Sequence, residues 1–325
     1  MAKRRLLSVN KIGHDKDIFR HKTEMGKTKV RMTTVKLREQ KRAPLASKYD
    51  IAKYDMRQGH QFPSELNKLI PSNTPEYVDM ENRYVERIMR AIYHFKQCAL
   101  VGPSGTGKTH IVYLVAELAG LPMWEINCGL QTSVYDLFGR YIGLGKGNWI
   151  DGQIVSWCRQ GGILYLDEAN MMRQDVATRL NPILDTRGHL VLNEKDNEII
   201  PRHPQGYLIA SMNPFSAEFA VTKPLNAAFR RRLTVWINFD YLSVGEKIAQ
   251  REIDLVATKG KVDEQTATRI VKVGAELRRQ YKSGDLPYGP SIGDLVNWAI
   301  LSSEGIPSPQ AAEETIISMT SDNEE

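Results

Sequence analysis

Cysteine is scarce in this sequence, and long apolar runs are missing. The chain of 325 residues has three cysteines, Cys98, Cys128 and Cys158, and no C-x-x-C pair. This number and spacing exclude a disulfide scaffold and a cysteine-based zinc site, and they indicate reduced, buried thiols. No stretch approaches the roughly 18 consecutive apolar residues of a membrane span, and no signal-peptide core follows the first basic residues. We therefore expect a cytoplasmic protein with no membrane span.

The overall composition is otherwise that of a globular protein. Hydrophobic residues make up 42%, charged residues 25% and aromatic residues 8% of the chain. These fractions exclude a wholly disordered or collagen-like chain. At about 150 residues per domain, the length favours two domains with a substantial core.

Positive charge is concentrated at the beginning of the chain. Residues 1–44 hold 14 Lys and Arg against 4 Asp and Glu, which leaves 30 against 34 of the chain's 44 basic and 38 acidic residues for the remainder. A basic arm of this kind is typical of binding to nucleic acid or another polyanion. A solubilising or partner-docking extension explains the same charge equally well. The segment 28–37 is compatible with a strand or with a solvated arm.

Strands and helices alternate through the middle of the chain. After a Pro-rich linker at 63–75, apolar residues recur at helical spacing from Val85 to Ile92. A short apolar strand at 98–101 is followed by a Gly-rich loop and a helix that ends at Gly120. Further strands are expected at 123–127, 163–167, 207–212 and 234–239. This alternation predicts an α/β fold whose mostly parallel sheet is covered on both faces.

The last part of the chain has helical patterns and no strand pattern. Ser243 and Glu246 form a capping-box signature before a helix that we expect to run to about residue 258. Further helices are expected from Asp263 to Tyr281 and after Pro290. We therefore expect a basic N-terminal extension at 1–60, a nucleotide-binding core at 61–240 and a small helical domain at 241–325.

The Gly-rich loop has the pattern G-x-x-x-x-G-K-S/T. Glycines allow successive backbone N–H groups to turn toward phosphates, and the following helix adds its positive N-terminal end. Lys108 would reach the β- and γ-phosphates and Thr109 would bind Mg²⁺. The expected nucleotide-binding residues are Gly102, Pro103, Ser104, Gly105, Thr106, Gly107, Lys108, Thr109 and His110.

Two adjacent carboxylates follow the apolar strand Ile163–Leu166. Ligands of open α/β sheets bind at the carboxyl ends of the strands, where Asp167 and Glu168 lie. Asp167 would then bind Mg²⁺, and Glu168 would polarise the attacking water. Capping of the next helix is the alternative role for these acids.

Polar residues also lie at the ends of two later strands. Asn213 could orient the attacking water or touch the γ-phosphate, or it could simply form a turn before Pro214. Arg230, Arg231 and Arg232 precede the last strand. An arginine that reaches a γ-phosphate raises the rate about 10³- to 10⁵-fold, whereas three adjacent arginines are also typical of a solvated or nucleic-acid-binding face.

Together these motifs resemble an AAA+ ATPase, and in finer detail the CbbQ/NorQ branch of the MoxR group. The resemblance covers about residues 75–240 and, more loosely, the helical domain. Besides the Gly-rich loop (the Walker A motif), Asp167-Glu168 (the Walker B motif) and Asn213, it rests on Asn127-Cys128, Asp136-Leu137-Phe138-Gly139-Arg140, Trp149-Ile150-Asp151-Gly152-Gln153-Ile154, Gly161-Gly162, Leu184-Asp185-Thr186-Arg187, His203-Pro204 and the arginine string before Leu233.

The resemblance implies a P-loop αβα sandwich with strand order 5-1-4-3-2, a helical lid, and a ring that is usually a hexamer. ATP with Mg²⁺ would lie at each subunit boundary, and ATP rather than GTP is the family's nucleotide. Arg232 matches the arginine that enters the neighbour's site, and Arg231 is a second candidate. An insertion within 128–154 and a hairpin within 187–206 would face the pore or a partner.

One departure from the family pattern concerns the helical domain. Relatives carry a second sensor arginine in a Ser-x-Arg string, where this chain has Gly293. The resemblance leaves two explanations: Arg278 or Arg279 substitutes for that arginine, or the lid is coupled to the nucleotide in another way.

Three functions fit these features. The resemblance favours a chaperone-like ATPase that remodels or activates a protein partner, often one with a von Willebrand A domain. The alternative is a nucleic-acid-directed ATPase that is recruited through the basic arm. A third reading is a ring that nucleotide stabilises without meaningful turnover, against which Glu168 and Asn213 argue.

Overall fold

The computed structural model describes residues 48–75, 77, 82–129, 132–142, 148–214 and 225–320. The chain divides into two units, Met1–Lys53 and Tyr54–Glu325. The basic arm at 1–44 and the possible strand at 28–37 lie outside the described residues. All elements below belong to the second unit.

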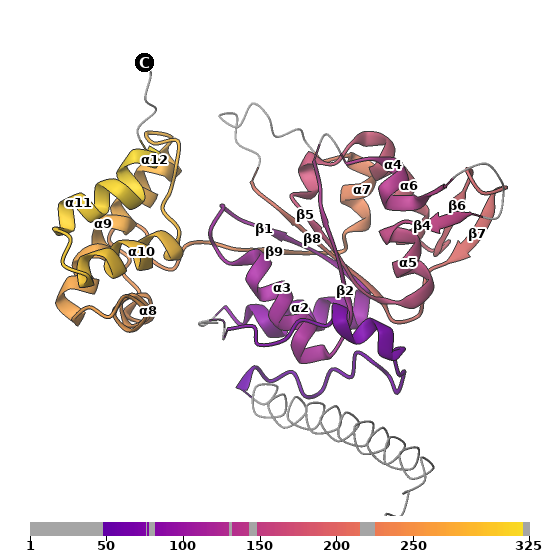
Figure 1. Cartoon of the computed structure of the whole chain (residues 1–325), viewed down its shortest axis with the longest axis horizontal. Coiled ribbons are helices and arrows are strands. Elements are labelled where there is room, and N and C mark those ends of the chain that lie inside the picture. Colours follow the sequence, from indigo (N-terminus) through magenta and orange to yellow (C-terminus); the bar gives the residue numbers. More distant parts are fainter. Residues whose placement is uncertain are drawn as a thin grey trace, which may run out of the picture. The chain divides into compact units, whose positions relative to one another are not determined.

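A five-stranded parallel sheet forms the centre of this unit (Figure 1). The strands lie in the order β2-β5-β8-β1-β9. In chain order this is 5-1-4-3-2, so the predicted topology is confirmed. The strands are β1 (Gln97–Val101), β2 (Met123–Asn127), β5 (Gly162–Asp167), β8 (Gly206–Met212) and β9 (Val235–Asn238).

The central strands β5 and β8 are mostly apolar because helices cover both faces of the sheet. Every residue of β8 is buried, and so are the first five residues of β5. Such strands read as continuous apolar runs rather than alternating ones, which is the pattern of a covered parallel sheet. The register pairs Leu166 of β5 with Ala210 of β8, so the ends of these two strands lie side by side.

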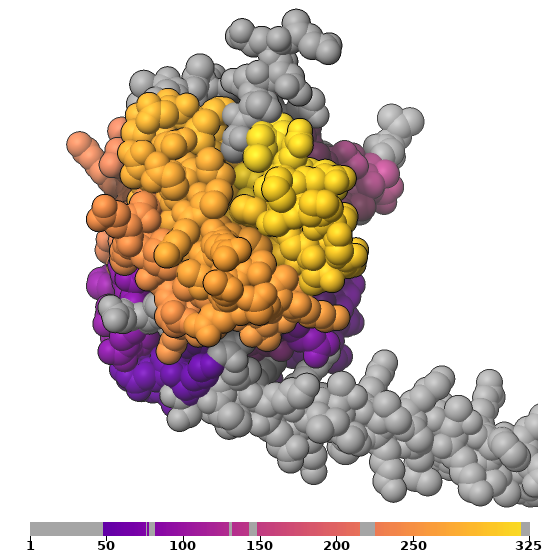
Figure 2. Space-filling model, turned by 90° about the vertical axis from the view of Figure 1, so that its left-hand side faces the viewer, coloured from indigo at the N-terminus to yellow at the C-terminus, as the bar shows by residue number. Residues whose placement is uncertain are grey.

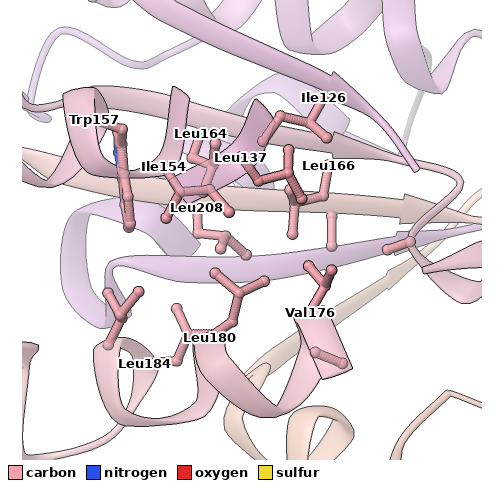
Figure 3. Packing of buried hydrophobic residues seen from close by; sticks show 14 of the residues in the cluster. Ile126, Leu137, Ile154, Trp157, Leu164, Leu166, Val176, Leu180, Leu184 and Leu208 are labelled. Atoms are coloured by element: carbon pink, nitrogen blue, oxygen red, sulfur yellow. The ribbon is translucent and has the colours of Figure 1, made fainter. Parts of the chain in front are cut away.

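Helices cover the sheet in two layers (Figure 1). On one face lie α2 (Tyr84–Phe95) and α3 (Lys108–Ala119), and on the other lie α4 (Val134–Phe138), α5 (Gln153–Gln160), α6 (Gln174–Leu184) and α7 (Ala227–Arg232). The predicted apolar positions of α2, from Val85 to Ile92, are buried. Figure 3 shows the second layer, where Leu164 and Leu208 of the sheet pack with Ile154 and Leu180 of the helices.

Two small antiparallel hairpins extend from the sheet. One consists of β3 (Gly139–Tyr141) and β4 (Trp149–Asp151), and the other of β6 (His189–Leu192) and β7 (Glu198–Pro201). They fall within the expected insertion at 128–154 and the expected hairpin at 187–206. This part also contains two short 3₁₀ helices, η2 (Ser64–Leu69) and η3 (Ala169–Met171).

The C-terminal helices have a hydrophobic core of their own. They are α8 (Gln250–Gly260), α9 (Glu264–Ser283), α10 (Ile292–Ser303), α11 (Ser308–Ala312), a π-helical turn η4 (Glu313–Ile317) and α12 (Ser318–Thr320). In Figure 2 they form the orange-to-yellow surface. Val256, Val271 and Leu295, from the three longest helices, are among the fully buried residues of this core.

The start of the first C-terminal helix differs from the prediction. Helix α8 begins at Gln250 rather than near Ser243. Gly245 has φ +56°, and Val244 forms an antiparallel bridge with Lys247, so the chain makes a tight turn there. The Ser243 hydroxyl accepts a hydrogen bond from the Ala249 N–H (3.0 Å) instead of capping a helix at Glu246.

The three cysteines are buried and free, as predicted. Burial raises the pKa of each thiol, Cys98, Cys128 and Cys158, to about 12. Within the described ranges, no helix combines the length and the hydropathy that crossing a bilayer requires.

Candidate nucleotide-binding site

The Gly-rich loop forms a turn between β1 and α3. Its Gly102 N–H donates to the Met212 carbonyl (3.2 Å), which ties the loop to the end of β8. Gly105 and Gly107 have φ values of +72° and +84°, a region that L-residues with a side chain rarely adopt. These left-handed positions turn backbone N–H groups inward, and α3 starts at Lys108 directly after them.

A cavity of about 350 Å³ opens at this edge of the sheet. Its walls come from the loop and the start of α3, from the end of β5 and from the end of β8. The lining residues are Ser104, Gly105, Gly107, Lys108, Thr109, His110, Asp167, Glu168, Ser211, Met212 and Asn213. The fold thus brings together most of the predicted nucleotide-binding residues with the two carboxylates and Asn213, from three separate segments.

Lys108 is buried in the wall of this cavity. Its Nζ donates to the carbonyls of Gly102 (2.6 Å) and Pro103 (2.7 Å) and to Oδ1 of Asn213 (3.2 Å). Burial lowers its pKa to about 8, although Asp167 and Glu168 act in the opposite direction. This ammonium group lacks the full solvation of an exposed lysine, so phosphate oxygens would be favourable partners for it.

Asp167 and Thr109 meet at the carboxyl end of β5. The Thr109 hydroxyl donates to Asp167 Oδ2 (3.3 Å), and the Glu168 N–H donates to Asp167 Oδ1 (3.1 Å). Glu168 is exposed and has φ +51°, a conformation that costs a non-Gly residue roughly 1–2 kcal/mol. Strained residues of this kind cluster at functional sites. The turn directs the chain away from the sheet directly after the two acids.

Two hydroxyl groups of this site were not predicted. Tyr165 lies within 2.9 Å of Asp167 Oδ1 and within 3.1 Å of Thr109 Oγ1, and the Ser211 hydroxyl donates to Asp167 Oδ1. Tyr165 and Ser211 each interrupt an otherwise apolar part of a strand. Since Tyr165 and Asp167 are two residues apart on one strand, their side chains lie on the same face. This two-residue spacing is the sequence signal from which the position of Tyr165 beside Asp167 could have been predicted.

His110 contacts the segment before α2 as well as the cavity. Its Nε2 lies 2.9 Å from the Pro75 carbonyl, and its ring stacks on Tyr77 with centroids 6.0 Å apart. The Tyr77 hydroxyl in turn donates to the Thr106 carbonyl (3.3 Å). Burial lowers the pKa of His110. These contacts hold Pro75 and Tyr77 against the Gly-rich loop and the start of α3.

The arginines of α7 do not join the cavity of their own chain. Within the described part of the chain, neither Arg231 nor Arg232 lines it. Arg232 Nη2 donates to Asp185 Oδ2 (3.1 Å) and Nη1 donates to the Ala228 carbonyl (2.8 Å), whereas Arg231 is exposed. Asp185 also binds Arg187 (2.7 Å), and these arginines hold the pKa of its carboxyl well below the usual range.

Helix α7 has a well-defined position because it is capped and anchored. The Asn226 side chain accepts hydrogen bonds from the N–H groups of Ala228 and Phe229, which caps the N-terminus. Phe229 is fully buried in the core. The arginines that follow are therefore presented at a fixed place at the end of the helix.

Neither candidate for the second sensor arginine reaches the cavity. The Arg278 side chain is fully buried and donates to Glu252 Oε1 (2.8 Å) and to the carbonyls of Pro290 (2.7 Å) and Ser243 (3.1 Å). Arg279 is exposed and pairs with Glu276 on its own helix. In the described residues, neither is among those that line the cavity.

The C-terminal helices touch the Gly-rich loop at two other points. A Cβ atom on Gly105 would collide with the Ser291 side chain, so the start of α10 lies directly against the loop. The Tyr241 hydroxyl lies between the carbonyls of Ser104 (3.3 Å) and Gly289 (3.1 Å). These contacts link the lid to the loop through a serine and a tyrosine.

Comparison with known proteins agrees with this geometry. An AAA domain model of the dynein-related subfamily matches residues 97–233, and a model of the CbbQ/NirQ/NorQ C-terminal region matches residues 252–325. The denitrification regulatory protein NirQ of Pseudomonas aeruginosa is 32% identical over 251 residues, which cover 77% of this chain and 92% of that protein. The chain belongs to the CbbQ/NirQ/NorQ family.

Two further relatives support the assignment. Protein NorQ of Paracoccus denitrificans is 32% identical over 70% of this chain and 80% of its own length. Protein CbbQ of Hydrogenophilus thermoluteolus is 31% identical over 74% of this chain and 86% of its own length. The predicted likeness to the CbbQ/NorQ branch is confirmed, and this member of the CbbQ/NirQ/NorQ family is an AAA+ ATPase that binds nucleotide.

Proposed function

We propose that the protein assembles into a hexameric ring, hydrolyses ATP at the subunit boundaries of that ring, and uses this energy to remodel or activate a partner protein. One observation carries the proposal: the cavity of a single chain has the lysine, the carboxylates and Asn213, but the α7 arginines lie outside it. An arginine from a neighbouring chain would complete the site. The NirQ relatives are named denitrification regulatory proteins, which supports a regulatory role for this chain.

Several residues of the cavity have positions that support a specific role. The inward-facing backbone of the Gly-rich loop and Lys108 would bind the phosphates. Glu168, exposed at the cavity, would orient the attacking water and take up its proton, while Asn213 would hold that water against the γ-phosphate. Arg232 of one chain, with Arg231 as the second candidate, would neutralise charge that develops in the neighbour's site.

The donor set at the end of β5 fits Mg²⁺. A hydroxyl and a carboxylate oxygen, Thr109 Oγ1 and Asp167 Oδ2, lie 3.3 Å apart and face the same cavity. Magnesium prefers oxygen ligands and is usually held by one or two protein groups together with phosphate oxygens. When bound, Mg²⁺ would neutralise charge on the β- and γ-phosphates.

The surface opposite α2 and α3 offers apolar side chains for a partner. Tyr135 of α4, Ile150 of β4 and Ile199 of β7 are 59%, 55% and 65% exposed. Exposed apolar side chains on neighbouring elements are typical of protein-interaction sites. These residues lie in the predicted insertion and hairpin, so we propose that they face the partner, a protein with a von Willebrand A domain.

The mixing of two inactive variants tests the shared site. Glu168→Gln should bind ATP without turnover, and Arg232→Ala should lose turnover by about 10³-fold or more. A mixture of the two should regain ATPase activity, because some boundaries then combine an intact Glu168 with an intact Arg232. The rate per subunit of the wild-type protein should also rise with protein concentration.

Arg230→Ala is the matched control for that experiment. Arg230 lies on the same helix, but its guanidinium is over the Trp236 ring, 5.3 Å from the centroid. The Arg230→Ala variant should keep its ATPase activity. If mixing restores nothing while each variant still assembles, the arginine does not act across a boundary.

A nucleic-acid-directed ATPase is the alternative proposal, and the basic charge of residues 1–44 favours it. Affinity for DNA or RNA should then fall steeply with salt and vanish when these residues are deleted. If the affinity for DNA or RNA does not depend on salt concentration, this alternative is excluded. We also propose that the chain has three parts, with boundaries after residues 60 and 240. A cytoplasmic location, which the free thiols support, is part of the same proposal.

A further inference from the structure

Tyr165 places a buried hydroxyl group beneath the carboxylate end of the cavity. Its side chain is completely buried in a strand whose neighbours, Leu164 and Leu166, are aliphatic. A phenylalanine would fill the same apolar space without a polar atom to satisfy. The hydroxyl instead lies 2.9 Å from Asp167 Oδ1, 3.1 Å from Thr109 Oγ1 and 3.1 Å from Ser211 Oγ.

The two oxygens of Asp167 have different partners. Oδ1 faces the sheet, where the Tyr165 and Ser211 hydroxyls and the Glu168 N–H surround it. Oδ2 accepts a hydrogen bond from Thr109 (3.3 Å). This arrangement fixes the plane of the carboxylate because rotation would exchange the two environments and break the contacts of Oδ1.

We propose that Tyr165 is a positioning residue that, together with Ser211, orients Asp167 so that its Oδ2 stays beside Thr109 Oγ1 for Mg²⁺. This inference deepens the proposed function and rests on its assignment of Thr109 and Asp167 to the metal. A phenol hydroxyl can donate a hydrogen bond to a carboxylate oxygen, which is the role that this geometry gives it. The side chain acts through Asp167 and does not line the cavity itself.

Loss of the hydroxyl should affect the metal far more than the nucleotide. Phosphate binding without metal depends on the backbone of residues 102–107 and on Lys108, whereas the hydrogen bonds described for the Tyr165 hydroxyl join it to Thr109, Asp167 and Ser211. Removal of a partner that orients a metal ligand typically lowers metal affinity about 10- to 100-fold. A loss of the Tyr165 hydroxyl should therefore weaken Mg²⁺ binding without weakening metal-free nucleotide binding.

Tyr165→Phe in the full-length protein tests the inference. The affinity for fluorescent ADP is measured in EDTA and then across a Mg²⁺ titration, and ATPase activity is followed against Mg²⁺ concentration. We expect the Mg²⁺ concentration that gives half of the maximal change in ADP affinity or ATPase activity to rise about 10-fold. The ADP affinity in EDTA should stay within about twofold of wild type, since the phosphate contacts are untouched.

Tyr207→Phe is the matched control. Tyr207 is also completely buried in the sheet, and its hydroxyl donates to the Met56 carbonyl (2.6 Å). It loses one buried hydrogen bond without touching Asp167, so its Mg²⁺ titration should match wild type. If Tyr165→Phe does not fold, Ser211→Ala removes another donor to the same oxygen and should shift the Mg²⁺ titration in the same direction.

The outcomes distinguish this inference from the proposed function. An unshifted Mg²⁺ titration of Tyr165→Phe, or equal shifts in both tyrosine variants, overturns the role of Tyr165 and leaves the ATPase assignment intact. If the ADP affinity and the ATPase turnover of the wild-type protein do not depend on Mg²⁺, the proposed metal site is wrong, and this inference is wrong with it.

Discussion

Lys108 in the core and Arg278 in the C-terminal helices are both buried cations, but their surroundings differ. Lys108 faces a cavity and is held by two backbone carbonyls and the Asn213 amide oxygen. Arg278 is sealed off from solvent with the Glu252 carboxylate and two carbonyls. A cation that has no carboxylate within hydrogen-bond distance and borders a cavity is suited to a ligand, whereas one paired with a buried carboxylate is suited to hold structure.

Arg278→Met should produce the largest change. It leaves the Glu252 carboxylate buried without its cation, which typically costs about 3–5 kcal/mol. Hydrogen exchange of α8, α9 and α10 should show this loss as a lower free energy of opening. Arg279→Met is the control, because that exposed side chain should contribute less than about 0.5 kcal/mol.

The double variant Arg278→Met/Glu252→Leu sharpens this prediction. With both charges gone, no buried ion remains unpaired, so the double variant should be more stable than Arg278→Met alone. A double variant that is less stable than both single variants would contradict the view of Arg278 as half of a structural pair.

Lys108→Met should have a smaller effect, and on binding instead of stability. ATP affinity should fall about 100-fold, as expected for the loss of charge-assisted hydrogen bonds of about 1.5–3 kcal/mol. The free energy of unfolding should not decrease, since a partly desolvated charge is removed. Calorimetry with ATP and urea denaturation measure the two quantities. Lys282→Met, at an exposed pair with Asp240, is the control for loss of one positive charge.

The lowered pKa of Lys108 predicts the smallest effect, a pH dependence of ATP binding. The protonated form binds phosphate, and the pKa of the free protein is about 8. ATP affinity should therefore be flat below pH 8 and fall by up to about tenfold per pH unit above it. Lys108→Arg should remove the dependence because arginine stays protonated.

The same shift has an opposite consequence for the stability of the nucleotide-free protein. Between the folded pKa of about 8 and the ordinary value of 10.5, the unfolded chain binds more protons at Lys108 than the folded chain. The Lys108 contribution to the free energy of unfolding should therefore rise with pH across this window. Comparison of urea denaturation of wild type and Lys108→Met at several pH values isolates that contribution.

Local patterns in the sequence were sufficient to predict the sheet and the cavity. Most residues of the five strands are apolar, so each strand could be placed within about one residue, and the family resemblance supplied their order. Asp167 is the last residue of β5, Asn213 directly follows β8, and Lys108 follows the Gly-rich loop after β1. Their convergence follows from the rule that parallel strands present their carboxyl ends at one edge.

Features that depend on tertiary contacts were harder to predict. Ser243 with Glu246 reads as a helix start, but Gly245 adopts a left-handed conformation and turns the chain. Arg278 and Arg279 are adjacent in sequence, yet the Arg278 side chain is buried and the Arg279 side chain is exposed, because adjacent residues of α9 point in different directions. No local pattern distinguishes these cases, since packing of the helices decides them.

The buried thiols make the protein convenient to label. Thiolate is the species that reacts with maleimides, and a pKa of about 12 leaves almost none of it at neutral pH. A single cysteine introduced at an exposed position such as Ser303 would then react selectively, with all three native cysteines left in place. A dye at that position would report movement of the C-terminal helices relative to a second fluorophore on a bound nucleotide.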